Sequence, residues 1–311
     1  PKGLVGSEMC IRDRNIRKIM PSLDDLKKRI KSVKSTQKIT KAMKMVAAAK
    51  LRKAQESAEK GRPYSQKMQN IILNLTKSIN ESQNAPKLLV GTGEDKKYLC
   101  VVLTSDRGLC GGFNSNICKL AKTNFKKILG EGKELNIITV GSKGHDQIKR
   151  EYGKYVIKKF SFKDKKNISF NEADEVGKEI ISLFNQNKFD KCIIFYNNFK
   201  NVITQIPQAQ QIIPAETKNL KEGNDQNFSY EFEPEEDEIL EDLLPKNIST
   251  QVFKALLENA ASEQGSRMTA MDNATRNAGD LVDKLTIDYN RSRQASITKE
   301  LIEIISGAES L

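Results

Sequence analysis

The two ends of the chain are each predicted to form one very long helix, and this feature constrains the fold more than any other. In Ser22–Ile79, only Gly61 and Pro63 interrupt a continuous helical pattern, and Asn247–Ser306 contains no proline. At 1.5 Å per residue, each helix would extend for roughly 85–90 Å. A helix of that length cannot bury its apolar stripe alone. We therefore expect the two helices to pack against each other as an antiparallel coiled coil.

Apolar residues recur at the 3-4 spacing of a coiled-coil seam in both helices. Polar residues interrupt this seam at Gln37 and Thr40 in the first helix and at Gln264 and Arg267 in the second. Buried polar groups can specify the register of a coiled coil, and they can equally mark contact with a third protein. The apolar seam positions are Leu23, Leu26, Ile30, Val33, Ala47, Leu51 and Ala54, and then Phe253, Leu257, Ala260, Met271, Ala274, Ala278, Leu281 and Leu285.

Residues 95–232 are predicted to form a central, Rossmann-like α/β domain. Short apolar strands alternate with helices near Asn116–Leu129 and Asn171–Asn187, which indicates a mostly parallel sheet with crossover connections. The fold class is therefore α+β or α/β. The domains are residues 20–80 and 247–306 for the coiled-coil helices, 95–232 for the α/β domain, and 233–246 for an acidic connector or short helix. The predicted strands are Leu99–Thr104, Asn136–Val140 and Lys191–Tyr196, with weaker ones at Val202–Ile206 and Tyr230–Phe232.

The net charge of +12 is concentrated in the first helix. Thirteen basic residues lie between Pro21 and Arg62, against four acidic ones. Such a run can be a solvated helix face, or it can face an acidic partner. No aromatic residues are interleaved with the basic ones to form a stacking platform, which disfavours nucleic acid. A basic coiled-coil protein that binds nucleic acid nevertheless stays an alternative.

The middle domain gives little support for an enzyme. The glycine-rich loop Ser105–Gly112 matches neither the dinucleotide nor the P-loop spacing, and a tight turn with close backbone packing explains it better. The single histidine, His145, has no ligand-spaced partner, which favours a position in a loop or at a helix start. The five cysteines lack a CxxC spacing and are expected to be reduced. No catalytic residue, cofactor or metal is predicted, and a dinucleotide-binding enzyme with helical arms is a second alternative.

Residues 1–19 do not match the pattern of the rest of the chain. They have no helical stripe and no apolar signal-peptide core. By contrast, Ser22 is a typical helix N-cap, and Asp24 and Asp25 in the first turn favour the helix dipole. We therefore expect residues 1–19 to be a non-native extension.

Four stretches of the chain resemble the gamma subunit of F-type ATP synthase. They are Ser35–Ala48, Ser105–Gly112, Ala261–Asp280 and Ile297–Ser310, in the family's order. The resemblance covers Met20 to Leu311, and the C-terminal stretches are most similar to alphaproteobacterial and mitochondrial members. It implies a central rotor shaft, present in one copy per complex. Its coiled coil stands inside the α3β3 hexamer, and its α/β domain lies near the epsilon subunit and the c-ring.

The resemblance also implies what this chain would do. The c-ring, driven by proton flow, turns the shaft, and the angle of the shaft sets the state of each catalytic β subunit. This subunit would hold no catalytic residues of its own, bind no nucleic acid, and sit peripherally on the cytoplasmic face of the cell inner membrane. The residues implied to contact β or to brace the helices are Lys38, Lys41, Met43, Lys44, Arg267, Arg293, Gln294, Thr298 and Glu300. Met43 is implied to lie against the Gln294–Thr298 turn.

Overall fold

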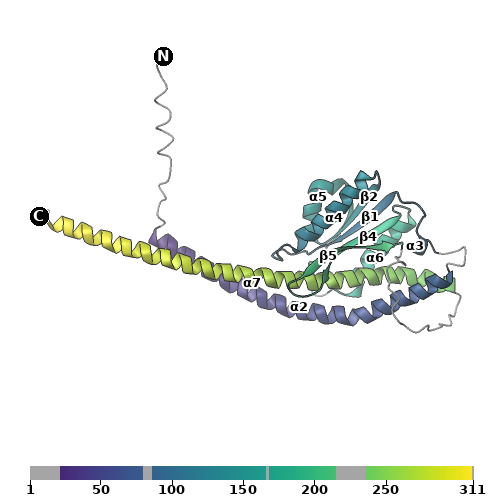
Figure 1. Cartoon of the computed structure of the whole chain (residues 1–311), viewed down its shortest axis with the longest axis horizontal. Coiled ribbons are helices and arrows are strands. Elements are labelled where there is room, and N and C mark those ends of the chain that lie inside the picture. Colours follow the sequence, from purple (N-terminus) through teal and green to yellow (C-terminus); the bar gives the residue numbers. More distant parts are fainter. Residues whose placement is uncertain (1–21, 80–85, 166–167, 215–235, 310–311) are drawn as a thin grey trace, which may run out of the picture. The chain divides into compact units, whose positions relative to one another are not determined.

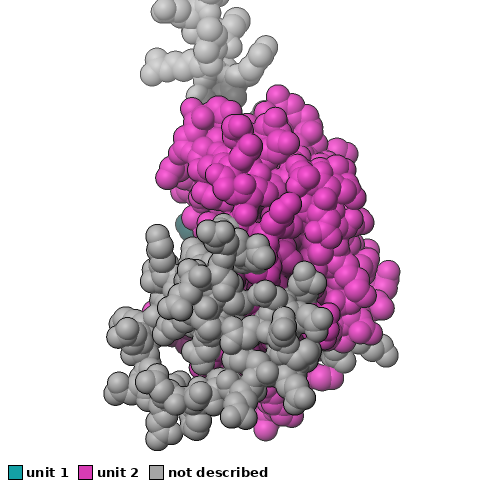
Figure 2. Space-filling model, turned by 90° about the vertical axis from the view of Figure 1, so that its right-hand side faces the viewer, with its two compact units in different colours: residues 1–42, 272–311 teal, residues 43–271 magenta. Residues whose placement is uncertain are grey.

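The structure, a computed structural model, describes residues 22–79, 86–165, 168–214 and 236–309 (Figure 1). The expected extension at 1–19 and the weak strand at Tyr230–Phe232 lie outside these ranges. The chain divides into two compact units, coloured separately in Figure 2. Unit 1 comprises residues 1–42 and 272–311, and unit 2 comprises residues 43–271.

The first helix, α2, spans Leu23–Ile79 without a break and passes through Pro63. Its start is capped as the sequence indicates, because the Asp25 backbone N–H donates to the Ser22 hydroxyl oxygen at 3.1 Å. Asp24 and Asp25 occupy the first turn, where a negative charge stabilises the positive end of the helix dipole.

The last helix, α7, spans Glu236–Glu309 and is 74 residues long. It begins well before the expected start near Asn247, and Pro245 lies inside it. The described part of the expected connector at 233–246 therefore belongs to this same helix. The acidic residues of the segment made it look separate, although acidic side chains are compatible with the first turns of a helix.

The central domain contains a five-stranded sheet in the order β3-β2-β1-β4-β5. The first four strands are parallel, and β5 runs antiparallel to β4. The strands are β1 (Lys97–Leu103), β2 (Glu134–Val140), β3 (Val156–Phe160), β4 (Lys191–Phe199) and β5 (Gln205–Ile213). The shorter helices are α3 (Lys87–Val90), α4 (Phe113–Gly130), α5 (Ser142–Tyr152), the 3-10 turn η1 (Gly153–Tyr155) and α6 (Phe170–Asn185).

Two features of the sheet differ from the sequence-based expectation. Strand β3 was not expected, because at the sheet edge it carries three exposed residues in a row, Ile157, Lys158 and Lys159. The weak strand expected at Val202–Ile206 is displaced. Val202 lies in the turn between β4 and β5, and the strand begins only at Gln205.

The core of unit 2 lies between the sheet and the helices on its two faces. Helices α4 and α5 cover one face, and α6 and α7 cover the other (Figure 1). This division follows from right-handed crossovers, since the chain moves one way from β1 to β3 and then reverses to reach β4. Phe125 of α4 and Val252 of α7 both contribute fully buried side chains to this one core. The part of α7 near Val252 is therefore built into the α/β domain.

Candidate functional site

In unit 1, α2 and α7 pack as an antiparallel pair. The hydroxyls of Thr40 and Thr275 are 2.8 Å apart, and Gly279 lies against the end of the Gln37 side chain. Thr40 is buried, and its hydroxyl donates to the Gln37 carbonyl oxygen of its own helix at 3.0 Å and accepts from the Thr275 hydroxyl of α7. The polar seam residues Gln37 and Thr40 thus set the register of the helix pair.

The apolar seam of α7 in unit 1 departs from the expected spacing at one position. Ala278, Val282 and Leu285 are buried, whereas Leu281, which the heptad pattern predicts to be on the seam, is 44% exposed. The prediction for Leu281 is wrong because a straight helix drifts from a strict heptad. The contact stripe therefore moves to the next residue.

The register in unit 1 also corrects the contact expected for Met43. Thr40 lies opposite Thr275 and Gln37 opposite Gly279, so a step forward along α2 is a step back along α7. By this count, Gln294 lies level with about Ser22 at the start of α2. The resemblance implied that Met43 lies against Gln294 and Thr298, but this register places them at different levels along the helix pair. A sequence does not contain the stagger between two helices, which only a contact such as Thr40–Thr275 reveals.

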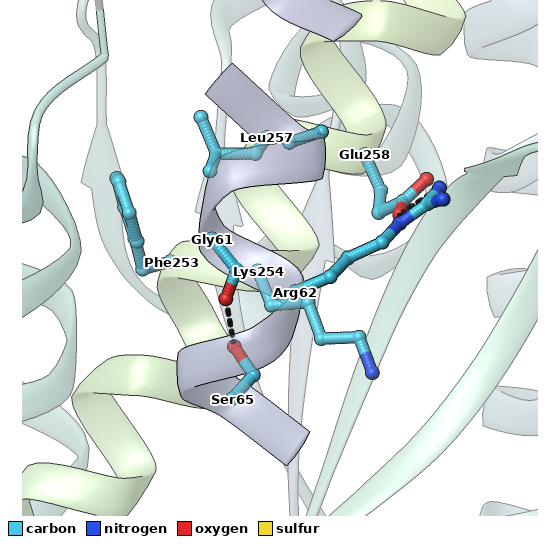
Figure 3. A pocket seen from close by; sticks show the side chains of 8 residues that line it. Gly61, Arg62, Ser65, Phe253, Lys254, Leu257 and Glu258 are labelled. Carbon is cyan, nitrogen blue, oxygen red and sulfur yellow. Dashed lines mark hydrogen bonds and ion pairs between the residues drawn. The ribbon is translucent and has the colours of Figure 1, made fainter. Parts of the chain in front are cut away.

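The antiparallel arrangement also holds in unit 2, where α2 and α7 enclose a small cavity (Figure 3). The Arg62 guanidinium donates to the Glu258 carboxylate at 3.0 Å, and a Cβ placed on Gly61 would lie 3.5 Å from the Leu257 side chain. The cavity has a volume of about 10 Å³, which is about the space that one water molecule needs. This crevice is a packing feature of the helix pair and is too small for a nucleotide.

The carboxyl edge of the sheet, where doubly wound folds bind ligands, is filled by the protein itself. The Asp106 carboxylate accepts hydrogen bonds from the Ser142 N–H and hydroxyl, the Ser161 hydroxyl and the Phe162 N–H at 2.8–3.0 Å. A Cβ on Gly141 would lie only 2.4 Å from the Thr104 carbonyl oxygen. Asp106 therefore ties together the loops that follow β1, β2 and β3.

The glycine-rich loop Ser105–Gly112 packs against α7. The Ser266 hydroxyl donates to the Cys110 carbonyl oxygen at 2.7 Å. Gly111 has a φ of +58°, and a Cβ there would contact Ala270 and Ser266. The positive φ favours glycine, and the two contacts of an added Cβ, both at 3.6 Å, are ordinary packing distances. The interpretation of this loop as a tight turn with close backbone packing is thus confirmed.

Arg267 joins this loop to α7 rather than extending into solvent. Its side chain is 12% exposed and forms an ion pair with Glu263 at 2.6 Å. It also donates to the carbonyl oxygens of Arg107 and Gly108 at 3.5 and 3.3 Å. Burial raises the pKa of the Glu263 carboxyl, and the positive charge of Arg267 opposes that shift. Arg267 thus neutralises the largely buried carboxylate of Glu263, whose side chain is 19% exposed, and holds a loop.

The other predicted residues lie at or near the surface of the two helices. Lys38 and Lys41 are exposed in unit 1, and Met43 and Lys44 are half-buried in unit 2. Large apolar side chains lie exposed among them in the sequence, namely Ile39 (57%), Met45 (60%) and Val46 (56%). This stretch of α2 therefore presents both basic and apolar groups.

The predicted residues near the end of α7 are also exposed: Arg293, Gln294, Thr298 and Glu300. Their described hydrogen bonds stay within the helix, from the Thr298 hydroxyl to the Gln294 carbonyl oxygen at 2.9 Å and from Ser296 to Glu300 at 3.2 Å. The structure does not bring these residues together with Lys38, Lys41 or Arg267. The predicted site is thus a set of separate positions along two helices.

The reactive side chains of the α/β domain are placed as the sequence indicates. The four cysteines within the described ranges are free and buried, and burial raises the pKa of the Cys118 thiol to about 11. His145 lies in the first turn of α5, beside the Thr139 hydroxyl at 3.1 Å, and burial lowers its pKa.

Among the residues that the structure describes, no three His, Cys, Asp or Glu side chains gather to hold a metal. In the same ranges, no helix is both long and apolar enough to cross a bilayer.

Sequence reasoning missed a buried polar face on α7. Glu258, Asn259 and Ser262 are 5%, 4% and 0% exposed, and they contact the end of β4. In the sequence they look like the solvent side of a helix. Their proximity in the sequence to the seam residue Ala260 was the only available signal.

Comparisons with known proteins agree on one family. The ATP synthase family model matches residues 22–311. The ATP synthase gamma chain of Pelagibacter ubique is 72% identical over 292 residues, which cover 94% of this chain and all of that protein. The gamma chain of Rhizobium leguminosarum is 56% identical over 294 residues, with the same coverage.

Solved structures show the same fold. A chain of the central stalk and c-ring of Tetrahymena thermophila mitochondrial ATP synthase has a TM-score of 0.57 at 28% identity, covering 76% of this chain and 99% of that one. A chain of the Euglena gracilis mitochondrial enzyme has a TM-score of 0.64 at 21% identity, covering 93% and 94%. The match of the family model and the 72% identity to a relative that is covered in full show that the chain belongs to the gamma-chain family of ATP synthase, and the long antiparallel helices and the mixed five-stranded sheet agree with this.

Proposed function

We propose that this chain is the central rotor subunit of a proton-translocating ATP synthase. It stands in one copy inside an α3β3 hexamer and couples rotation of the c-ring to the conformational cycle of the β subunits. The α/β domain contacts the epsilon subunit and the c-ring. The chain carries no catalytic residue or cofactor of its own. It is a peripheral protein on the cytoplasmic face of the inner membrane.

One observation carries this proposal: the last turns of α7 are apolar and uncovered. Leu301, Ile302, Ile304 and Ile305 are 54–68% exposed, and Ile297 one turn earlier is 49% exposed. By the register of unit 1, this segment extends past the described start of α2. A helix that is apolar on several sides needs a surrounding partner. The inner wall of a ring of subunits would enclose it.

The basic residues of α2 are suited to a contact with β subunits that changes as the rotor turns. We propose that Lys38, Lys41 and Lys44 face acidic segments of β, and that Met43 lies at the same contact. Exposed ion pairs contribute only about 0–1 kcal/mol each and are screened by salt. Such pairs steer the partner surfaces without holding the rotor at one angle.

The asymmetry of the helix pair is what would order the catalytic sites. A single pair within a threefold ring presents a different face to each β subunit. A rotor favours one state of a site only to the extent that it contacts the states differently. Arg293, Gln294, Thr298 and Glu300, exposed on α7, are proposed to supply such contacts. Rotation then changes which β subunit meets them.

Co-expression with α and β subunits tests the proposal. The intact complex is weighed by native mass spectrometry, and the expected mass contains one copy of this chain per α3β3. ATP is then expected to drive rotation of a bead fixed to the α/β domain. A complex with three copies of this chain, or with none, would contradict the proposal.

A further inference from the structure

The end of strand β4 lacks a strand partner on one side. Strand β1 pairs with β4 only as far as Phe195, while β4 continues to Phe199 along β5. Asn197 lies opposite Pro207 of β5, and Phe199 lies opposite Gln205. Because alternate residues of a strand direct their backbone groups to opposite neighbours, the groups of Asn197 and Phe199 that point away from β5 need partners from the side that β1 has left.

Side chains of α7 supply these partners. The Asn197 N–H donates to the Asn259 side-chain oxygen at 3.3 Å, and the Ser262 hydroxyl donates to the Asn197 carbonyl oxygen at 2.9 Å. The Phe199 N–H donates to the Glu258 carboxylate at 3.2 Å. Three neighbouring side chains on one helix thus continue the hydrogen-bond ladder that β1 began.

Helix α2 closes the same junction from its other side. Arg62 donates to the second oxygen of the Glu258 carboxylate at 3.0 and 3.3 Å (Figure 3). The Glu258 side chain is only 7% exposed, so its charge needs this partner. One carboxylate therefore connects α2, α7 and the backbone of β4.

We propose that Glu258, Asn259 and Ser262, together with Arg62, form the joint through which torque passes between the α/β domain and the helix pair. This proposal rests on the proposed rotary function and names the residues that carry the load. Directed hydrogen bonds to a strand backbone resist sliding and twisting, whereas apolar contacts alone are not directional. A rotor loaded at the α/β domain needs such a directional attachment to its helices.

Torsional stiffness of the assembled complex tests the joint. The α3β3 ring is fixed to a surface and the complex is arrested with nucleotide. A bead is attached through a cysteine introduced at Lys119, an exposed residue of α4, with Cys10→Ser in every version. For Asn259→Ala/Ser262→Ala, we expect wider angular fluctuations of the bead than for the parent. The rate of ATP hydrolysis without a bead is expected to be unchanged.

Ser65→Ala is the matched control. The Ser65 hydroxyl is also buried between the helices, but it donates to the Gly61 carbonyl oxygen of its own helix at 3.1 Å. This control should fluctuate as the parent does. The proposal would be overturned if the Asn259→Ala/Ser262→Ala complex fluctuated no more widely than the parent. It would also be overturned if the Ser65→Ala control fluctuated as widely as the double variant.

Hydrogen exchange provides a second test, which also works for a variant that assembles poorly. In Asn259→Ala, the amide of Asn197 should exchange about tenfold faster, which corresponds to the loss of one hydrogen bond of about 1.4 kcal/mol. The amides of Ile193 and Ile194, in the part of β4 that lies between β1 and β5, should keep their rates. A uniform increase along β4 would show general loosening and would contradict a specific joint. If the bead on the parent complex does not rotate with ATP, the proposed rotary function is wrong. The exchange rate of the Asn197 amide still tests whether the joint exists.

Discussion

Arg267 shows how one side chain can serve a buried acid and a loop at once. Replacing it with methionine leaves the Glu263 carboxylate without its cation and two loop carbonyl groups without a donor. Because both side chains keep some contact with solvent, we expect Arg267→Met to reduce the free energy of unfolding by about 2–3 kcal/mol. Urea unfolding of the isolated chain measures this. Adding Glu263→Gln should restore part of the loss, and a loss below about 0.5 kcal/mol would refute the assignment.

The surroundings of Asp190 predict that the stability this carboxylate contributes depends on pH. Burial acts to raise its pKa. The Thr92 hydroxyl at 2.7 Å and the N–H groups of Lys97 and Lys96 outweigh burial, so the pKa is lowered in the folded chain. A group whose pKa is lower when folded stabilises the fold above its unfolded pKa, near 3.9, and loses that effect as pH falls through the folded pKa.

Asp190→Asn should therefore be less stable than the parent at pH 7, by about 1–3 kcal/mol. Below about pH 4 the difference between the two should shrink. Urea unfolding at pH 7, 5 and 3.5 checks the sign. Asp164→Asn, at an exposed loop residue, is the control. A difference that grows toward low pH would show that the carboxylate does not stabilise the fold.

Helix α6 is seated on α7 through a glycine. A Cβ on Gly177 would lie 2.4 Å from the Ser249 hydroxyl oxygen and 3.1 Å from the Ser249 Cα. Gly177→Ala should therefore destabilise the chain by about 1–3 kcal/mol, although alanine favours a helix. Thermal melting of Gly177→Ala measures the effect. Gly130→Ala, where no atom lies within 4 Å of the added Cβ, should be neutral or stabilising. Equal melting temperatures for the two variants would show that α6 does not need a glycine at position 177 to pack on α7.

Buried elements could be predicted from the sequence, and elements at edges and junctions could not. Strands β1, β2 and β4 are apolar runs buried on both faces, which the pattern reveals. Strand β3 is an edge strand with two lysines, so its pairing decides its structure and no local pattern does. The stagger that moves Gln294 away from Met43, and the partnership of Asn259 with β4, depend on tertiary contacts. Such contacts are absent from a single sequence.

The end of α7 is expected to matter for assembly and hardly for folding. The large apolar residues of 301–305 are exposed, so they contribute little burial within the chain. Deleting Leu301–Leu311 should change the melting temperature of the isolated chain only slightly. Capture by the α3β3 ring should fall markedly, as measured by co-purification. A large drop in melting temperature would instead show that this segment packs within the chain.

At the scale of the whole molecule, a rotor must turn without its helices sliding past each other. Thr40 and Thr275 allow a direct test, because their hydroxyl oxygens are 2.8 Å apart and a disulfide needs sulfur atoms about 2.0 Å apart. We expect Thr40→Cys/Thr275→Cys to form a disulfide on oxidation. ATP-driven proton pumping in membrane vesicles should then match that of the reduced form and of each single variant. Pumping that stops on oxidation and returns with a reductant would mean that α2 and α7 move relative to each other during each cycle, and that the pair does not turn as one body.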